Sequence, residues 1–228
     1  RESVLKEITE DRIYLFYTAF LLNLTGLCGV VITGDAFNLF VFIEIASLSS
    51  YAMISVSRKR QSLLAAYRYL ILGTIGATFI LIGIGLLYVM TGTLNIADLA
   101  TRIKEVEDTR TIATAFAFFT VGVCIKFGLF PLHYWLPNAY TYAPSVVSAF
   151  LSGTTSKVFI YVLLRFLFTI FGAEYAFDVM LLDRILIVVA ILAIISGSLA
   201  AIYQDNIKKM LAYSSIAQIG YMILGISL

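Results

Sequence analysis

Uncharged apolar runs, each long enough for a membrane-spanning helix, recur along this sequence and constrain its fold more than any other feature. A bilayer core of about 30 Å is crossed by roughly 20 helical residues. Only 13% of the 228 residues are charged, whereas soluble domains carry about 25%. The pattern predicts an all-α polytopic membrane protein, with one transmembrane domain over residues 1–228.

About seven membrane helices are expected, and one of them is discontinuous. All three prolines, Pro131, Pro137 and Pro144, lie in a long run with few charges. Proline removes a backbone donor and clashes with the preceding turn, so a helix break is expected between Gly128 and Pro131. The expected helices cover residues 13–34, 36–57, 63–92, 111–128 with 131–140 as one broken helix, 145–171, 185–204 and 206–228. A polar loop is expected over residues 93–110.

Basic residues at the ends of the runs predict the orientation. Lys and Arg cluster at residues 58–60 and again at 208–209, in turns expected on the same side of the membrane as the amino end. Because cytoplasmic loops are enriched in Lys and Arg, the amino end is expected to face the cytoplasm.

The composition also argues against several functional classes. A net charge of +2 and a single His give no basic field for nucleic acid. The sequence has no GxGxxG motif, Walker loop, CxxC pair or metal-ligand cluster, so we expect no cofactor, no metal and no redox or catalytic centre in this chain. Cys28 and Cys124 both lie in apolar runs and are expected to be reduced and structural.

Three ionisable residues, Glu44, Lys126 and Lys157, lie deep within the apolar runs. A charge near the centre of a membrane helix costs about 2.5 to 3.5 kcal/mol on insertion scales, so such residues usually face a partner, a cavity or an ion pathway. Ser47 and Tyr51 follow Glu44 at i+3 and i+7, which places the three on one helix face. Lys126 precedes the expected break, where a cavity or surrounding protein must accommodate the irregular backbone.

Polar residues around the break and on the following helix extend this pattern. His133 lies just beyond the break, and Lys157 shares a helix face with Thr154 and Tyr161. Ser148 and Ser152 add hydroxyl groups to the same helix. One carboxylate and two amines in a low-dielectric interior can influence each other's protonation, which is what carrying protons across a membrane requires.

Structural roles remain as alternatives for each of these residues. Glu44 and Lys126 can be a buried ion pair that only orients helices, and Lys157 can extend along its helix to reach water. His133 is as readily explained as a hydrogen-bond partner.

Three stretches resemble the antiporter-like subunits shared by NADH-quinone oxidoreductase, Mrp cation/proton antiporters and membrane-bound hydrogenases. Phe37 to Tyr51, FNLFVFIEIASLSSY, is similar to the glutamate-bearing helix of that family. Ile125 to Arg165, which includes KFGLFPLHYWLPNAY and SKVFIYVLLR, resembles its broken helix and the helix that follows. Gln204 to Tyr221 resembles the opening of the family's second half. The SKVFIYVLLR string and Ser152 look most like the D-type Mrp subunit and its hydrogenase counterparts.

The resemblance implies roles for the buried charges and partners for the chain. Glu44 matches the family's key glutamate, Lys126 the broken-helix lysine that pairs with it, and Lys157 the lysine that passes the proton onward, while His133 matches a histidine common after the break. Family members act with other membrane subunits in a cell (inner) membrane complex that moves H⁺ and, in some members, Na⁺.

The family fold has about fourteen helices in two inverted five-helix halves. The chain begins in a charged segment at Arg1 and stops within an apolar run at Leu228. We therefore expect an internal piece of a longer polypeptide, holding the first half of the fold and the start of the second.

Other functions stay open at this point. The main expectation is a proton-translocating subunit of a membrane-bound hydrogenase or an Mrp-type H⁺/Na⁺ antiporter. A proton-pumping subunit of NADH-quinone oxidoreductase (complex I) is the alternative, followed by a structural membrane scaffold and by a stand-alone transporter of an organic solute.

Overall fold

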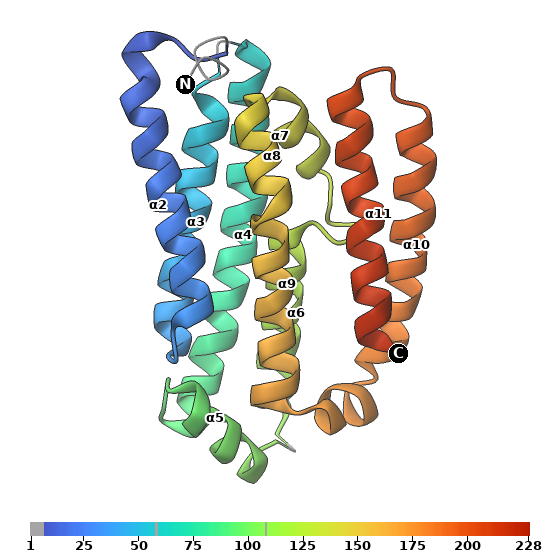
Figure 1. Ribbon diagram of the computed structural model, residues 1–228. Coiled ribbons are helices and arrows are strands. Elements are labelled where there is room, and N and C mark those ends of the chain that lie inside the picture. Colours follow the sequence, from blue (N-terminus) through green and yellow to red (C-terminus); the bar gives the residue numbers. More distant parts are fainter. Residues whose placement is uncertain (1–6, 58, 108) are drawn as a thin grey trace.

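The computed structural model describes residues 7–57, 59–107 and 109–228, and within them the chain is a bundle of helices with no named strand (Figure 1). The elements, in chain order, are η1 (Glu10–Arg12), α2 (Ile13–Ile32), α3 (Ala36–Ser55), α4 (Arg60–Thr91), α5 (Ile96–Arg102), η2 (Ile103–Glu105), α6 (Arg110–Phe127), α7 (Leu136–Tyr142), α8 (Ser145–Gly153), α9 (Thr155–Arg165), the π-helical η3 (Phe166–Phe171) and η4 (Tyr175–Val179), α10 (Leu182–Ile202) and α11 (Ile207–Ser227).

Seven helical segments of the described chain are long and apolar enough to cross a membrane, as the sequence predicts. Their outward faces carry large apolar side chains, of which Val89 is 77% exposed and Ile202 76% exposed. In water such surfaces would be unfavourable, whereas in a bilayer they face lipid. The chain is thus a multi-pass membrane protein.

The helices α4 and α6 pack so closely that their backbones touch. A Cβ atom added to Gly122 would lie 2.7 Å from the Gly76 carbonyl oxygen. Small residues allow this kind of approach between membrane helices. Because Lys126 lies one helical turn beyond Gly122, the contact helps to set the depth at which Lys126 sits.

The expected break in the helix that carries Lys126 is present. The helix α6 ends at Phe127, and Gly128 adopts a left-handed conformation with φ of 76°. Its N–H and that of Leu129 donate to the Cys124 carbonyl oxygen, at 3.1 and 3.0 Å. The chain resumes as α7 only at Leu136, after a non-helical stretch that includes Pro131. Pro137 lies in the first turn of α7 and Pro144 directly before α8, where proline is tolerated.

A second break, which the sequence pattern did not indicate, divides the segment expected as one helix over residues 145–171. The helix α8 stops at Gly153, and α9 starts at Thr155. Between them Thr154 has φ of −116° and ψ of −58°, and its Oγ1 donates to the Phe150 carbonyl oxygen at 2.7 Å. Such back-bonding by Thr bends helices, and the preceding Gly lowers helix propensity.

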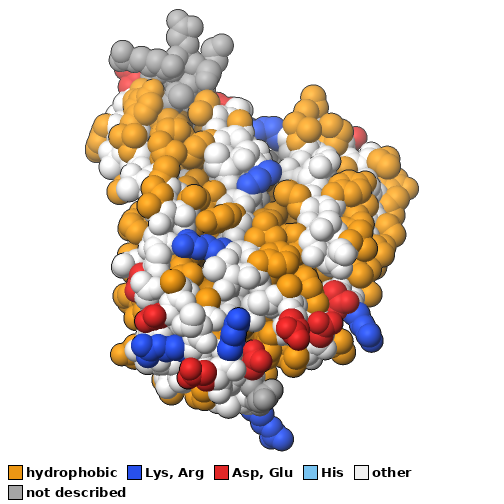
Figure 2. Space-filling model, turned by 60° about the horizontal axis from the view of Figure 1, so that its bottom comes forward, with side chains coloured by type: hydrophobic (Ala, Val, Ile, Leu, Met, Phe, Trp, Pro, Cys, Tyr) orange, Lys and Arg blue, Asp and Glu red, His pale blue; other side chains and the backbone are white. Residues whose placement is uncertain are grey.

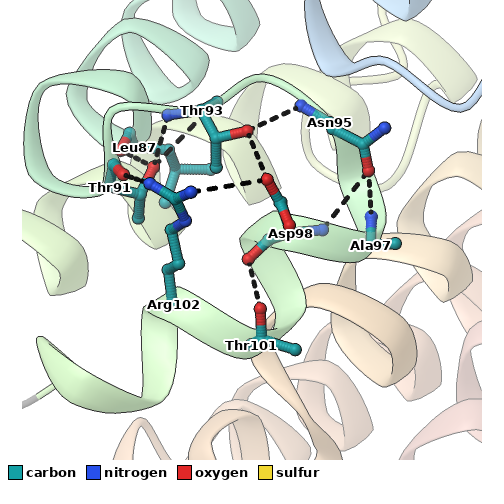
Figure 3. Close-up of polar contacts among 8 residues, drawn as sticks. All are labelled: Leu87, Thr91, Thr93, Asn95, Ala97, Asp98, Thr101 and Arg102. Atoms are coloured by element: carbon teal, nitrogen blue, oxygen red, sulfur yellow. Dashed lines mark hydrogen bonds and ion pairs between the residues drawn. The ribbon is translucent and has the colours of Figure 1, made fainter.

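The segment expected as a polar loop contains the short helix α5. Asn95 caps it, because its Oδ1 accepts from the N–H groups of Ala97 and Asp98 at 3.0 and 3.3 Å (Figure 3). Arg102 then reaches back to Asp98 at 3.6 Å and donates to the Thr91 carbonyl oxygen at 3.1 Å. The buried side chains of Ile96 and Leu99 hold α5 against the bundle.

The two ends of the bundle differ in charge. The α3–α4 and α10–α11 turns lie at the same end of the bundle as the start of α2 (Figure 1). Lys59 and Arg60 belong to the first of these turns and the start of α4, and Lys208 and Lys209 to the first turn of α11. The opposite end, turned forward in Figure 2, shows acidic and basic side chains intermixed along its rim. This arrangement agrees with the expected sidedness of the turns, while the orientation toward the cytoplasm stays a prediction.

Candidate functional site

Lys126 and Glu44, which are 82 positions apart in the sequence, form an ion pair inside the bundle. The Lys126 side chain is buried, and its Nζ lies 2.9 Å from Glu44 Oε1 and 2.8 Å from Ser47 Oγ. The Glu44 side chain is 25% exposed. The last turn of α6 therefore presents an ammonium group to the polar face of α3, and the three polar residues predicted for these positions converge on one point.

A residue that sequence reasoning missed, Asn23 of α2, holds α3 beside this point. Asn23 is fully buried, and its Nδ2 donates to the Ala46 carbonyl oxygen at 2.5 Å and to Ser50 Oγ at 2.7 Å. Its Oδ1 has no hydrogen-bond partner among the described residues. The available signal was an Asn at the centre of the first apolar run, because a buried amide requires polar partners.

Tyr51 continues the polar face of α3, but its hydroxyl is enclosed. The residue is 7% exposed, and its oxygen has no hydrogen-bond partner in the described structure. The oxygen sits directly over Gly73 of α4, where an added Cβ would overlap it. The Tyr69 ring meets the Tyr51 ring edge-on, with centroids 4.5 Å apart.

The aromatic contacts continue from Tyr69 to the break. Trp135 stacks on Tyr69 with centroids 3.8 Å apart and an interplanar angle of 4°. Its Nε1 donates to the Ile125 carbonyl oxygen at 3.0 Å. The Ile125 carbonyl also accepts from the Gly128 N–H at 3.3 Å, so the indole adds a second hydrogen bond at the end of α6, one residue before Lys126.

His133 lies after the break, and the structure shows no hydrogen bond or ion pair between it and the Lys126–Glu44 pair. Its ring stacks on Phe130 with centroids 5.4 Å apart, and Nδ1 is buried without a partner among the described residues. The part of His133 in a relay therefore stays a prediction.

Lys157 is on the surface of α9, although the sequence places it deep in an apolar run. Its Nζ donates to the Ser152 carbonyl oxygen, and no ion pair among the described residues includes it. Tyr161 on the same face is 37% exposed, and Thr154 is half-buried. The α10–α11 hairpin makes its main outside contacts with α7 and η4, which leaves this face of α9 uncovered.

Hydroxyl groups predicted to line a polar path surround a cavity of about 220 Å³ between α7, α8 and α11. Ser148 and Ser152 line it together with Tyr140, Ser215 and Lys208. Ser148 Oγ donates to the Tyr140 carbonyl oxygen at 2.6 Å, and the Tyr140 hydroxyl lies 3.2 Å from Ser156 Oγ. Since Ser152 also accepts from Lys157, this cavity borders the lysine.

The described residues contain no group of three or more His, Cys, Asp or Glu side chains positioned to hold a metal ion. Cys28 is exposed and Cys124 buried, and both are free thiols.

Comparison with known proteins identifies relatives over nearly the whole chain. The family model described as NADH:quinone oxidoreductase/Mrp antiporter, TM, matches residues 33–228. The N subunit of the NADH-quinone oxidoreductase of Desulforudis audaxviator is 47% identical over 93% of this chain and 42% of its own length. The D-type subunit of the Na⁺/H⁺ antiporter of Alkalihalophilus pseudofirmus is 34% identical over 96% of this chain and 44% of its own length.

Solved structures agree with these matches. A chain of the membrane-bound sulfane sulfur reductase, an archaeal respiratory membrane complex, is 37% identical with a TM-score of 0.84 over 92% of this chain and 42% of its own. The Mrp complex from Dietzia sp. DQ12-45-1b gives 31% identity and a TM-score of 0.82 over 92% of this chain and 38% of its own. The chain spans less than half the length of these relatives. With a matching bundle, a broken helix and a family model that covers most of its residues, the chain belongs to the NADH:quinone oxidoreductase/Mrp antiporter transmembrane family.

Proposed function

We propose that this chain is a proton-translocating, antiporter-like subunit of a multisubunit ion-pumping complex in the inner cell membrane. Glu44, Lys126 and Lys157 relay protons in this proposal, and His133 is a further candidate. The observation that carries it is the buried Lys126 ammonium, held 2.9 Å from Glu44 and 2.8 Å from Ser47 at the end of a broken helix.

The physical support is the low stability of such a charge unless its partner remains in place. Removing one member of a buried ion pair typically costs about 3 to 5 kcal/mol, because the other charge is left uncompensated. Movement of Lys126 away from Glu44, or protonation of Glu44, would therefore favour loss of a proton from Lys126. The irregular backbone of residues 128–135 provides the place where such a movement can occur without disrupting a continuous helix.

Lys157 is the proposed next group. Its exposed Nζ borders the hydroxyl-lined cavity, so it can exchange protons with hydrated neighbours more readily than Lys126 can. Tyr140 of α7 and Ser156 of α9, whose hydroxyl oxygens lie 3.2 Å apart, are hydrogen-bonding groups for intervening water.

Substitutions at the ion pair test the proposal against a purely structural role. We expect Lys126→Met and Glu44→Gln each to abolish proton transport in the assembled complex. The double variant Glu44→Gln/Lys126→Met has no uncompensated charge, so we expect it to assemble about as well as the native protein while transport stays lost. Proton flux in proteoliposomes and subunit content after purification are the two measurements.

Lys104→Met, which changes an exposed lysine at the opposite end of the bundle, is the matched control and should transport normally. A scaffold role predicts instead that the double variant recovers transport together with assembly. Solute-dependent uptake by the native protein would support the third alternative, a transporter of an organic solute.

The parent complex is a separate question, because this chain matches relatives named as subunits of NADH-quinone oxidoreductase and relatives named as subunits of Na⁺/H⁺ antiporters. The 47% identity to an N subunit favours NADH-quinone oxidoreductase as the alternative to a hydrogenase or an Mrp-type antiporter. Mass spectrometry of the co-purifying membrane proteins distinguishes these assignments. Dependence of proton flux on added Na⁺ tests whether sodium is exchanged.

A further inference from the structure

A cavity with basic lining residues lies where α2 begins and α3 ends, and it has no part in the proposed proton path. It has a volume of about 410 Å³, and Arg12, Lys59 and Arg60 are among the residues that line it. Asp11 is the one acidic residue in the lining, so the cavity carries two more positive than negative charges. Among the described residues, no carboxylate lies within ion-pair distance of any of the three cations.

An apolar groove of about 580 Å³ runs from this cavity down the outer face between α2 and α3. Leu15 and Leu22 line it from α2, and Ile45 and Leu48 from α3. Ser55 and Val56 line both the groove and the charged cavity, so the two spaces meet at the end of α3. With a rise of 1.5 Å per residue, the stretch from Ile45 to Val56 spans about 16 Å, roughly the thickness of one leaflet.

We propose that the cavity and the groove together bind one anionic phospholipid. The phosphate lies among Arg12, Lys59 and Arg60, and one acyl chain lies in the groove. Guanidinium groups match the geometry of phosphate oxygens, and basic pockets between membrane helices are a recurring headgroup site. The surface is cationic at the helix ends and apolar over the thickness of one leaflet below them. It therefore matches an anionic headgroup followed by an acyl chain.

The opposite end of the molecule shows that basic residues alone do not make such a site. A cavity of about 350 Å³ there includes Lys104, but Glu107 and Glu174 also line it. The two carboxylates outnumber the amine, so this cavity does not favour an anion. Of the two cavities, only the one where α2 begins and α3 ends combines an excess of positive charge with an adjoining apolar groove.

Native mass spectrometry of the full chain in detergent tests the site with dioleoyl phosphatidylglycerol, and with dioleoyl phosphatidylcholine as the zwitterionic lipid of the same acyl chains. We expect about one tightly retained phosphatidylglycerol per chain. At about fivefold for each basic residue, the variant Arg12→Gln/Lys59→Gln/Arg60→Gln should bind it about a hundredfold more weakly. The control Lys104→Gln/Arg110→Gln/Arg184→Gln, which removes three exposed basic residues from the other end, should bind it normally.

The groove is tested separately by Ala52→Trp, which places a large ring in it. This variant should weaken retention of both lipids, whereas Val188→Trp on the exposed face of α10 should not. Equal losses in the two triple variants would show a general charge effect and overturn the proposal. It would also fail if glycerol 3-phosphate displaced the lipid as effectively as intact phosphatidylglycerol does, or if a photocrosslinker at Leu48 captured another protein's helix and no lipid.

Discussion

At the scale of single residues, a charge within an apolar run is visible in the sequence, but the neighbours that it meets in the fold are not. Glu44 and Lys126 were found because charges are rare in apolar runs, and the structure joins them. Asn23 was missed because an isolated amide in a first helix gives no partner to look for, although it is the residue that ties α2 to α3. The exposure of Lys157 depends on which helices cover α9, and a residue's depth in its own helix does not contain that information.

Gly73 gives a residue-scale prediction, because its missing side chain is what accommodates the Tyr51 hydroxyl. In Gly73→Ala the new Cβ would overlap that oxygen, and Tyr69 restricts how far the Tyr51 ring can turn. Overpacking of this kind costs about 1 to 3 kcal/mol of unfolding free energy. Tyr51→Phe added to this variant should restore part of the loss, because the closest contact becomes the ring carbon at 2.9 Å.

Thermal unfolding in detergent measures both effects. Gly85→Ala on the same helix is the control, since nothing lies within 4 Å of its added Cβ. It should be neutral or slightly stabilising because Ala favours a helix. Equal destabilisation by Gly73→Ala and Gly85→Ala would rule out the contact with Tyr51 as the cause.

Glu7 gives a second residue-scale prediction, concerning pH. Partial burial acts to raise its pKa, but hydrogen bonds from Ser145 N–H and Oγ and the charges of Lys208 and Lys59 outweigh burial and lower it. A carboxyl whose pKa is lowered on folding adds stability above its unfolded pKa, near 4.3, and loses it as the pH falls through the folded pKa. Native protein should thus lose stability relative to Glu7→Gln as the pH falls below about 4.3.

The check is the unfolding temperature of both proteins between pH 3 and pH 7, with Glu10→Gln as the exposed control. A constant difference between native protein and Glu7→Gln over that range would contradict the assigned role of the Ser145 contacts.

At the scale of elements, helix existence was predictable and helix interruption only partly so. The prolines and Gly128 predicted the break after α6, because proline lacks a backbone N–H donor and glycine readily adopts a left-handed conformation. The interruption at Thr154 has no proline, and it arises from a side-chain hydrogen bond to Phe150 that a sequence pattern does not distinguish from an ordinary helical Thr. The α5 helix was similarly hidden, because its Asn95 cap and its two buried residues are spread among charges.

The break itself should depend on Trp135. Trp135→Phe keeps an aromatic ring against Tyr69 but removes the N–H that donates to the Ile125 carbonyl oxygen. A hydrogen bond of this kind contributes about 1 kcal/mol, so residues 126–132 should open about fivefold more often. Hydrogen exchange with mass spectrometry over this segment is the measurement, and proton flux should fall because the position of Lys126 becomes less fixed.

Tyr134→Phe is the neighbouring control. Tyr134 is 63% exposed, and its ring contact with Arg68 survives in Phe. If the two variants exchange at the same rate, the Trp135 hydrogen bond does not stabilise the break.

At the scale of the whole molecule, the chain consists of a bundle from α2 to α9 and a hairpin of α10 and α11 beside it. The hairpin is tight within itself, since an added Cβ on Gly220 would lie 2.9 Å from the Ala190 carbonyl oxygen. Its main contact with the bundle is between α11 and α7, and α10 also packs against η4, which connects the bundle to the hairpin. Apolar periodicity predicted both helices but not this arrangement, because lipid-facing and protein-facing positions are equally hydrophobic.

The last prediction concerns the polar contact that joins the two parts. Lys208 Nζ donates to the Ala143 carbonyl oxygen at 2.7 Å, at the turn between α7 and α8. Lys208→Met keeps most of the side-chain length but removes the donor, which leaves that carbonyl without its ammonium partner. Hydrogen bonds to charged groups contribute about 1.5 to 3 kcal/mol when buried, and this one is only partly buried, so we expect about 1 kcal/mol. Amides of α7 and of the first turns of α11 should then exchange about fivefold faster, whereas those of α4 and α6 should not change.

Lys209→Met, at the adjacent position and without a side-chain hydrogen bond in the described structure, should leave all four helices unchanged. If Lys208→Met accelerates exchange equally throughout the bundle, the hairpin and the bundle open as one unit, and the division into two parts is wrong.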